Sequence, residues 1–164
     1  MRPKGQTAYL GLGSNLGDKE MNLRRALQLL HQAEIQILKA SPLYVTEPVD
    51  FKDQDWFLNQ AVSIQTSLGP RDLLSYCLQI EQNMGRHRTA FKGPRNIDLD
   101  LLLYSDFVIQ EKGLTIPHPM LHTRRFVLVP LATLAPEVLH PVLRQTISTL
   151  LDSCPDPSQV VLFK

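Results

Sequence analysis

Residues 57–85 read FLNQAVSIQTSLGPRDLLSYCLQIEQNMG, a strand pattern that runs directly into a helix pattern. From Phe57 to Thr66 the chain alternates and is rich in β-branched residues, which predicts a strand. Phe57, Asn59, Ala61 and Ser63 are expected on one face of it, and Leu58, Val62 and Ile64 on the other. Gly69 and Pro70 end this strand, and Pro70 suits the first turn of an amphipathic helix that Gly85 can terminate.

Similar patterns extend outward on both sides. Upstream, a strand is predicted over 7–12, a helix from the N-cap Asp18 to Glu34, and extended chain over 35–37 and 43–45, interrupted by Ser41-Pro42. Downstream, the patterns predict a strand over 97–104 that forms a hairpin through Ser105-Asp106 with 107–109, extended chain over 114–116, helices over 125–134 and 147–151, and an edge strand over 160–163.

This order of elements, strand, helix, strand, strand, helix, strand, predicts an α+β fold. We expect a ferredoxin-like sandwich, with a mainly antiparallel sheet, helices on its faces and appended C-terminal elements. That architecture hosts enzymes, regulatory modules and RNA-binding domains, so the function has to be inferred from individual sites.

Composition narrows the class of protein. The chain has 164 residues, of which 43% are apolar and 20% charged, and this predicts a single globular domain over 1–164. A net charge of +1 gives no reason to expect a nucleic-acid partner. No apolar run approaches the roughly 18 residues of a membrane span, and the two cysteines are expected to be free thiols. A cytoplasmic monomer that does not contact membranes is therefore expected.

The chemistry-bearing pattern is Asp98-Leu99-Asp100, inside the predicted strand 97–104. A two-residue period places both carboxylates on one face, where they repel each other unless a cation lies between them. Hard oxygen ligands suit Mg²⁺, which also accepts substrate phosphates. An exposed strand face with two solvated aspartates is the alternative.

Basic residues precede these aspartates on a loop that contains glycine and proline. Arg86, Arg88, Lys92 and Arg95 lie within a dozen residues of Asp98. Because guanidinium groups bind phosphate oxygens in a bidentate manner, this loop could bind a triphosphate opposite the carboxylates. A solvated basic loop is the alternative.

Two smaller clusters point to ligands less strongly. Pro117 and Pro119 fix the backbone around His118, which suits a ligand contact or a turn-stabilising role. Phe57 and Asn59 share a strand face that could bind a planar heterocycle, although the residues by themselves favour core packing for Phe57 and loop capping for Asn59.

Taken together, these motifs resemble the hydroxymethyldihydropterin pyrophosphokinase (HPPK) family. The resemblance covers about residues 9–131, and its motifs are 11–17 (GLGSNLG), 57–59 (FLN), 85–88 (GRHR), 93–100 (GPRNIDLD), 117–119 (PHP) and 124–126 (RRF). It implies transfer of diphosphate from ATP, as co-substrate, to the hydroxymethyl oxygen of 6-hydroxymethyl-7,8-dihydropterin, with release of AMP.

The resemblance also implies a role for individual residues. The predicted metal ligands, for two Mg²⁺ ions, are Asp98 and Asp100. The predicted pterin residues are Thr46, Glu47, Val49, Phe57, Asn59 and Phe126. The predicted ATP residues are Glu81, Arg86, Arg88, Arg95, Leu101, Thr115, His118 and Arg124. Catalysis would rest on Arg86, Arg95, Asp98 and Asp100.

The sequence departs from the family pattern at a few positions. Lys92 stands where many members carry an aromatic residue, which Phe91 could replace, and Leu78 stands where a glutamine often contacts ATP. Two other functions stay open: a metal-dependent phosphodiesterase or nucleotidyltransferase that uses the same aspartates, and a non-catalytic module that binds a nucleotide or RNA.

Overall fold

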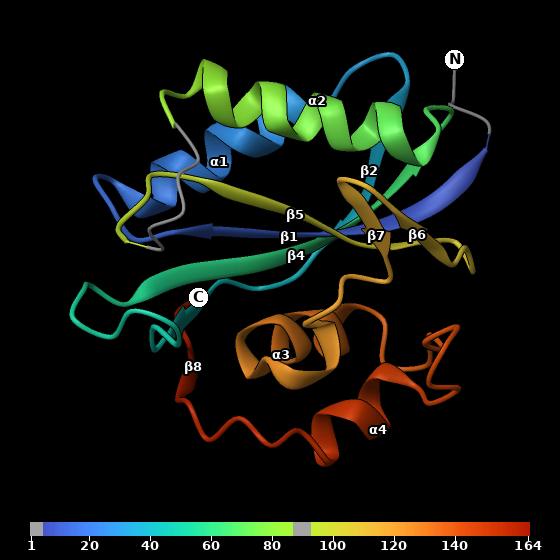
Figure 1. The fold of residues 1–164 in the computed structure, drawn as a ribbon. Helices are drawn as coiled ribbons and strands as arrows, with labels where there is room; N and C mark the ends of the chain where they lie inside the picture. The colour runs from blue at the N-terminus through green and yellow to red at the C-terminus, as the bar shows by residue number, and fades with distance from the viewer. Residues whose placement is uncertain (1–4, 87–92) are drawn as a thin grey trace.

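The structure is a computed structural model that describes residues 5–86 and 93–164. Its centre is a six-stranded sheet with the order β5-β1-β4-β3-β8, and β2 pairs with β4 as well (Figure 1). The strands are β1 (Gln6–Ser14), β2 (Ile35–Ala40), β3 (Tyr44–Thr46), β4 (Phe57–Thr66), β5 (Asp98–Tyr104) and β8 (Val160–Leu162). Their pairings are antiparallel.

Two helices, α1 (Lys19–Leu30) and α2 (Pro70–Asn83), cover one face of the sheet (Figure 1). Their apolar stripes pack on side chains of β1, β4 and β5, and Leu23, Leu30, Leu73 and Ile80 are at most 2% exposed. The predicted cap is present, since Asp18 accepts a hydrogen bond from the backbone N–H of Met21 at 3.1 Å. The helices and this face of the sheet thus enclose one hydrophobic core.

The opposite face carries α3 (Arg125–Leu134) and α4 (Ile147–Asp152) (Figure 1). A second core lies between these helices and the sheet and includes Ala61, Leu102, Leu103, Leu128, Leu131 and Ile147. The faces of β4 divide as predicted, because Ala61 belongs to this core while Leu58, Val62 and Ile64 belong to the first.

β2 and β3 lie one after the other along the same edge of β4. β2 pairs with residues 62–66 of β4 and β3 pairs with residues 57–59, and Ser41-Pro42 separates them as predicted. Ser41 holds the break in place, because its hydroxyl accepts a hydrogen bond from the N–H of Ala61 at 2.9 Å. β3 and its loop are thereby held at one end of the sheet.

Two predicted elements differ from the structure. The first helix ends at Leu30 and not at Glu34, because Gln32 and Ile35 exchange backbone hydrogen bonds that start β2. The predicted hairpin through Ser105-Asp106 is wrong, since β6 (Ile109–Glu111) pairs with β7 (Leu114–Ile116) and not with β5. The tight turn forms instead at Gly113, whose φ of +79° is one that glycine adopts without strain.

The order of β1, α1, β2 with β3, β4, α2 and β5 confirms the ferredoxin-like α+β fold, to which α3, α4 and β8 are appended. Within the described part of the chain, none of the helices combines the length and the apolar character needed to cross a bilayer.

Candidate active site

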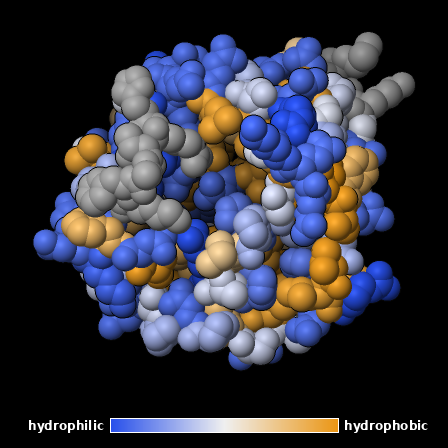
Figure 2. All heavy atoms as spheres, in the orientation of Figure 1, coloured by the Kyte–Doolittle hydropathy of each residue, from blue (hydrophilic) through white to orange (hydrophobic). Residues whose placement is uncertain are grey.

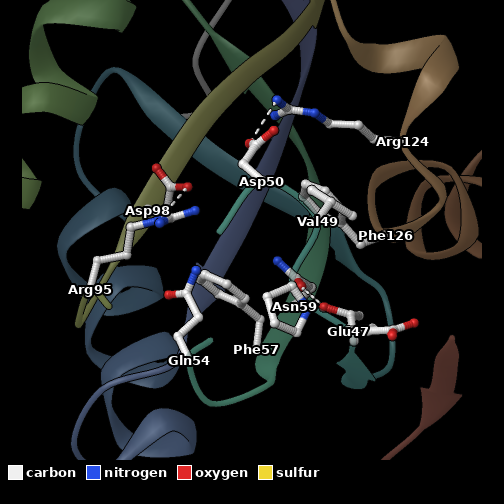
Figure 3. A pocket seen from close by; sticks show the side chains of 12 residues that line it. Glu47, Val49, Asp50, Gln54, Phe57, Asn59, Arg95, Asp98, Arg124 and Phe126 are labelled. Carbon is white, nitrogen blue, oxygen red and sulfur yellow. Dashed lines mark hydrogen bonds and ion pairs between the residues drawn. The ribbon is translucent and has the colours of Figure 1, made fainter. Parts of the chain in front are cut away.

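A pocket opens at the end of the sheet where β3, β4 and β5 approach the start of α3 (Figure 3). Its lining comprises Thr46, Glu47, Pro48, Val49, Asp50, Gln54, Phe57, Asn59, Arg95, Asp98, Arg124 and Phe126. We call it the β4 pocket. It includes all six predicted pterin residues, although they come from β3, the following loop, β4 and α3. In the space-filling view, the molecular surface is hollowed near the middle (Figure 2).

Asp98 and Asp100 lie on the same face of β5, as predicted. In the register with β1, Asp98 lies opposite Gly13 and Asp100 opposite Gly11. Both aspartates line a smaller cavity beside the β4 pocket, together with both glycines. Because the glycines have no side chains, the space above these carboxylates is left open.

The carboxylate of Asp98 is held by two arginines. Arg86 Nη1 lies 2.6 Å from one of its oxygens and Arg95 Nε lies 3.4 Å from the other. Arg86 also donates to the carbonyl oxygen of Ile97 at 2.9 Å and lies 3.5 Å from the carboxylate of Glu81. Arg86 and Arg95, which are predicted to bind the triphosphate, thus contact Asp98, which is predicted to bind the metal.

Glu81 lies within the fold and anchors the start of β5. Its side chain is 2% exposed and accepts a hydrogen bond from the N–H of Leu99 at 2.7 Å. This is a position between α2 and β5. The predicted contact of Glu81 with ATP stays a prediction.

Arg95 also covers Phe57 inside the β4 pocket. Its guanidinium carbon lies 4.6 Å from the centre of the phenyl ring, a cation–π arrangement (Figure 3). The open volume of the pocket is about 30 Å³, enough for a water molecule or two. A planar bicyclic ligand on the face of Phe57 therefore requires Arg95 to move.

Asn59 is fixed at the floor of the pocket. Its amide oxygen accepts a hydrogen bond from the hydroxyl of Thr46, and its amide nitrogen donates to the carbonyl oxygen of Leu12 at 3.2 Å. A side-chain amide has two donors and can accept more than one hydrogen bond, so it can still hydrogen-bond a ligand in this fixed orientation.

A second cavity lies on the other side of β5, and we call it the β7 pocket. It is lined by Leu74, Leu78, Leu99, Asp100, Leu101, Gly113, Leu114, Thr115, His118 and Pro119, with a volume of about 330 Å³. It gathers three predicted ATP residues, Leu101, Thr115 and His118. His118 Nδ1 accepts a hydrogen bond from the N–H of Met120 at 3.1 Å, so Nε2 carries the proton of the neutral ring.

Three residues that the sequence patterns did not indicate also shape the site. Asn15 is 1% exposed, and its side chain links the Gln54 side chain and the carbonyl of Asp55 to the N–H of Arg95. Asp50 forms an ion pair with Arg124, and Gln54 lines the β4 pocket. Asn15 lies inside the motif 11–17, which contributes to the family resemblance but gave Asn15 no role of its own, and no periodic signal marks the other two.

The structure thus brings together most of the predicted site residues. Arg124 reaches the β4 pocket from the start of α3, where its guanidinium carbon lies 5.7 Å from the centre of the Phe126 ring. Arg88, Phe91 and Lys92 lie outside the described residues, so their predicted roles stay predictions.

The donors at Asp98 and Asp100 fit a divalent cation of the magnesium type. They are two hard carboxylates on one face beside open space. In residues 5–86 and 93–164 no group of three or more histidine, cysteine, aspartate or glutamate side chains is close enough to hold a metal. A cation here would take its remaining ligands from water and phosphate, as Mg²⁺ commonly does.

Comparisons with known proteins match this chain to one family. Residues 9–136 match the family model of 7,8-dihydro-6-hydroxymethylpterin-pyrophosphokinase. The chain is 48% identical over 132 residues to the 2-amino-4-hydroxy-6-hydroxymethyldihydropteridine pyrophosphokinase of Bacillus subtilis, which covers 80% of this chain and 79% of that protein.

Longer relatives contain this region as one part. The chain is 49% identical over 153 residues to the folic acid synthesis protein fol1 of Schizosaccharomyces pombe, but this covers 93% of the chain and only 21% of that protein. The crystal structure of wild-type HPPK-DHPS from Plasmodium falciparum superposes with a TM-score of 0.75 at 21% identity, covering 91% of this chain and 41% of that one. The latter comparison shows the shared fold.

Proposed function

The chain belongs to the 7,8-dihydro-6-hydroxymethylpterin-pyrophosphokinase family, and from this we propose that it transfers diphosphate from ATP to 6-hydroxymethyl-7,8-dihydropterin. The hydroxymethyl oxygen attacks the β-phosphorus of ATP and the bond from that phosphorus to the α,β-bridging oxygen breaks. AMP leaves with the bridging oxygen, and the hydroxyl proton is released. The products are AMP and the pterin diphosphate, which is an intermediate of folate synthesis.

One observation carries this proposal: the strand with the two aspartates lies between two pockets of different character. Asp98 lines the β4 pocket, which has aromatic side chains and an amide, and Asp100 lines the β7 pocket. A pterin in the first pocket and a nucleotide in the second would therefore meet at these carboxylates. Positioning of this kind supplies much of the rate in phosphoryl transfer.

Asp98 and Asp100 would hold the two Mg²⁺ ions of the proposed reaction. Bound there, the ions would neutralise phosphate oxygens and polarise the phosphorus that is attacked. The protein contributes the alignment of the carboxylates, which the pairing of β5 with β1 fixes opposite Gly13 and Gly11.

In the β4 pocket, Phe57 and Phe126 would stack on the two faces of the pterin ring, and Asn59 would hydrogen-bond its polar edge. Thr46 and the carbonyl of Leu12 orient the Asn59 amide before the ligand arrives. Glu47 and Val49 complete the wall of the same pocket.

Arg86 and Arg95 would exchange partners on nucleotide binding. Both are paired with Asp98. The two guanidinium groups would then bind the phosphate oxygens of ATP, with Arg88, Arg124 and His118 as further contacts. Thr115, Leu101 and Glu81 are proposed to line the nucleotide site.

We also propose that residues 1–164 act as one catalytic domain and as a monomer on free small-molecule substrates. Cys77 and Cys154 are both free thiols, which suits the reducing cytoplasm.

The proposal is tested by incubating the protein with ATP and MgCl₂, with and without 6-hydroxymethyl-7,8-dihydropterin, and measuring nucleotides and pterin products. We expect AMP and pterin diphosphate in equal amounts, formed only when both substrates and Mg²⁺ are present. Release of ADP, or AMP formation without pterin, would contradict diphosphate transfer. Cleavage of nucleic acid would favour the phosphodiesterase, and binding without turnover would favour the non-catalytic module.

A further inference from the structure

Asp50 has no role in the reaction proposed above, yet it contacts one of the proposed nucleotide ligands. Its carboxylate oxygen lies 3.3 Å from Nη2 of Arg124 (Figure 3). The Arg124 side chain is 16% exposed, whereas that of Asp50 is 44% exposed. The pair joins the loop after β3 to the start of α3.

The pair lies on a boundary between two cavities. Val49, Asp50 and Arg124 line the β4 pocket, and the same three residues line an open cavity on its outer side with Met120 and Asp156. Val49 immediately precedes Asp50 in the loop. The ion pair therefore anchors the part of the loop that forms the pocket wall.

Hydrogen bonds fix the backbone of Arg124, whereas its side chain can pair either with Asp50 or with a bound phosphate. Its carbonyl oxygen accepts hydrogen bonds from the N–H groups of Val127 and Leu128, both at 3.1 Å, in the first turn of α3. Its guanidinium ends at Asp50. A triphosphate that uses this guanidinium has to compete with the carboxylate.

The charge of the loop adds to this competition. Residues 47–56 carry four acidic side chains and one lysine, which gives a formal charge of −3. Among these acids, Asp50 is the one placed against Arg124 in the described contacts. Like charges in a partly enclosed site disfavour an approaching anion. Neutralising Asp50 should therefore favour nucleotide binding in two ways: it releases Arg124, and it lowers the negative charge of the loop.

We propose that Asp50 is a positioning residue that holds Arg124 on the wall of the β4 pocket and competes with the nucleotide for it. The inference rests on the proposed function and adds a residue to it. While Asp50 holds Arg124, the Val49 wall is in place for the pterin. When a triphosphate takes Arg124, the loop loses this anchor. Asp50 thus sets the affinities for the two substrates in opposite directions.

The test uses Asp50→Asn, which keeps the shape of the side chain and removes its charge. The nucleotide probe is Mg²⁺ with an ATP analogue that has a methylene group between the α- and β-phosphorus, so that no AMP can leave. We expect the dissociation constant of this probe to fall about two- to five-fold, the size of a partly exposed ion pair. The dissociation constant of pterin without nucleotide should rise by a similar factor.

Two controls separate the ion pair from a general effect of charge. Asp53→Asn makes the same charge change at an exposed position of the same loop and should leave both constants within error of wild type. In a double-mutant cycle, Asp50→Asn should tighten nucleotide binding much less in the background of Arg124→Gln, because only the change in loop charge remains when the ion pair is absent.

The outcomes are distinct. If Asp50→Asn leaves nucleotide affinity unchanged, or tightens it equally with and without Arg124, the inference is overturned while the proposed function stands. A wild-type protein that binds neither the nucleotide probe nor the pterin would overturn the proposed function, and this inference with it.

Discussion

At the scale of single residues, the floor of the β4 pocket depends on the absence of a side chain. Gly13 lies opposite Asn59 in the pairing of β1 with β4 and opposite Asp98 in the pairing with β5. A Cβ atom at Gly13 would lie 2.6 Å from the Asn59 amide nitrogen. Asn59 cannot move aside without losing its hydrogen bonds to Thr46 and Leu12.

Gly13→Ala is therefore expected to weaken pterin binding about ten-fold, since it displaces a hydrogen-bonding amide and costs on the order of 1–2 kcal/mol. Nucleotide affinity should change much less. Fluorescence titration with pterin measures the effect. Gly11→Ala is the matched control, because its Cβ would meet Leu102 at an ordinary 3.5 Å. Equal pterin affinities in the two variants would refute the role given to Gly13.

The two aspartates provide the second prediction at this scale. Asp98→Asn or Asp100→Asn should lower AMP release by about two orders of magnitude or more, because each removes a charged ligand of the proposed cation. Binding of Mn²⁺ with nucleotide, followed by electron paramagnetic resonance, should weaken in parallel. Asp106→Asn, in the exposed turn after β5, is the control. Full turnover in either strand variant would exclude the metal assignment.

Single-residue roles were predictable where a short motif carries them. Asp98 and Asp100 share a face because of strand geometry alone. The pairing of Asp50 with Arg124 spans 74 positions and follows no period, so only the folded chain shows it. The same holds for Asn15, which joins segments that lie about 40 and 80 positions away.

At the scale of elements, the segment between α2 and β5 contains Arg86 and Arg95, the two arginines that contact Asp98. The guanidinium of Arg95 contacts both Phe57 and Asp98. On Phe57 it takes the position proposed for the planar pterin ring, and at Asp98 it takes the position proposed for a cation. The side chain of Arg95 therefore fills this part of the site. Substrate binding has to displace this arginine before it can contact phosphate.

This arrangement predicts that Arg95→Ala affects binding and turnover in opposite directions. Pterin affinity without nucleotide should rise about two- to five-fold, since a cation–π contact of roughly 0.5–1 kcal/mol no longer competes. AMP formation should fall by about two orders of magnitude. Pterin titration and steady-state kinetics measure the two effects. Weaker pterin binding with unchanged turnover would contradict both expectations.

Elements were predictable where local signals agree. β4 and α3 have the predicted limits, because strand alternation and a continuous apolar stripe are strong patterns. The β6–β7 hairpin was missed because the choice between two candidate turns depends on Gly113, and the end of α1 was missed because pairing to Ile35 overrides helix periodicity.

At the scale of the whole molecule, the sheet has one core on each face, and the segment between α3 and α4 closes the second. His140 lies in this segment and is 5% exposed. Its Nδ1 accepts hydrogen bonds from the N–H groups of Val142 and Leu143 at 3.2 and 3.0 Å. Burial, and then the nearby His122, lower the pKa of His140.

Because this pKa is lower in the folded than in the unfolded chain, the unfolded chain binds more protons as the pH falls below about 6.5. Stability should therefore be complete above that pH and decrease as the pH falls towards the folded pKa. Urea unfolding at pH 7.5 and 5.0 measures the loss. His140→Asn keeps an acceptor without titrating and should reduce the difference between the two pH values.

The exposed His31→Asn is the control and should retain the wild-type difference. An identical pH dependence in His140→Asn and wild type would show that His140 does not contribute to acid lability.

β8 has a consequence for the design of experiments. It pairs with β3 so that Val160 lies opposite Thr46, and Gln159 exchanges two 3.0 Å hydrogen bonds with Glu47. Leu162 is 61% exposed on this strand. A fluorophore attached there would be one strand away from the pocket wall and could report ligand exchange in real time. A bulky affinity tag placed directly after Lys164 would pull on the same wall, so tagged and untagged preparations should be compared before substrate constants are assigned.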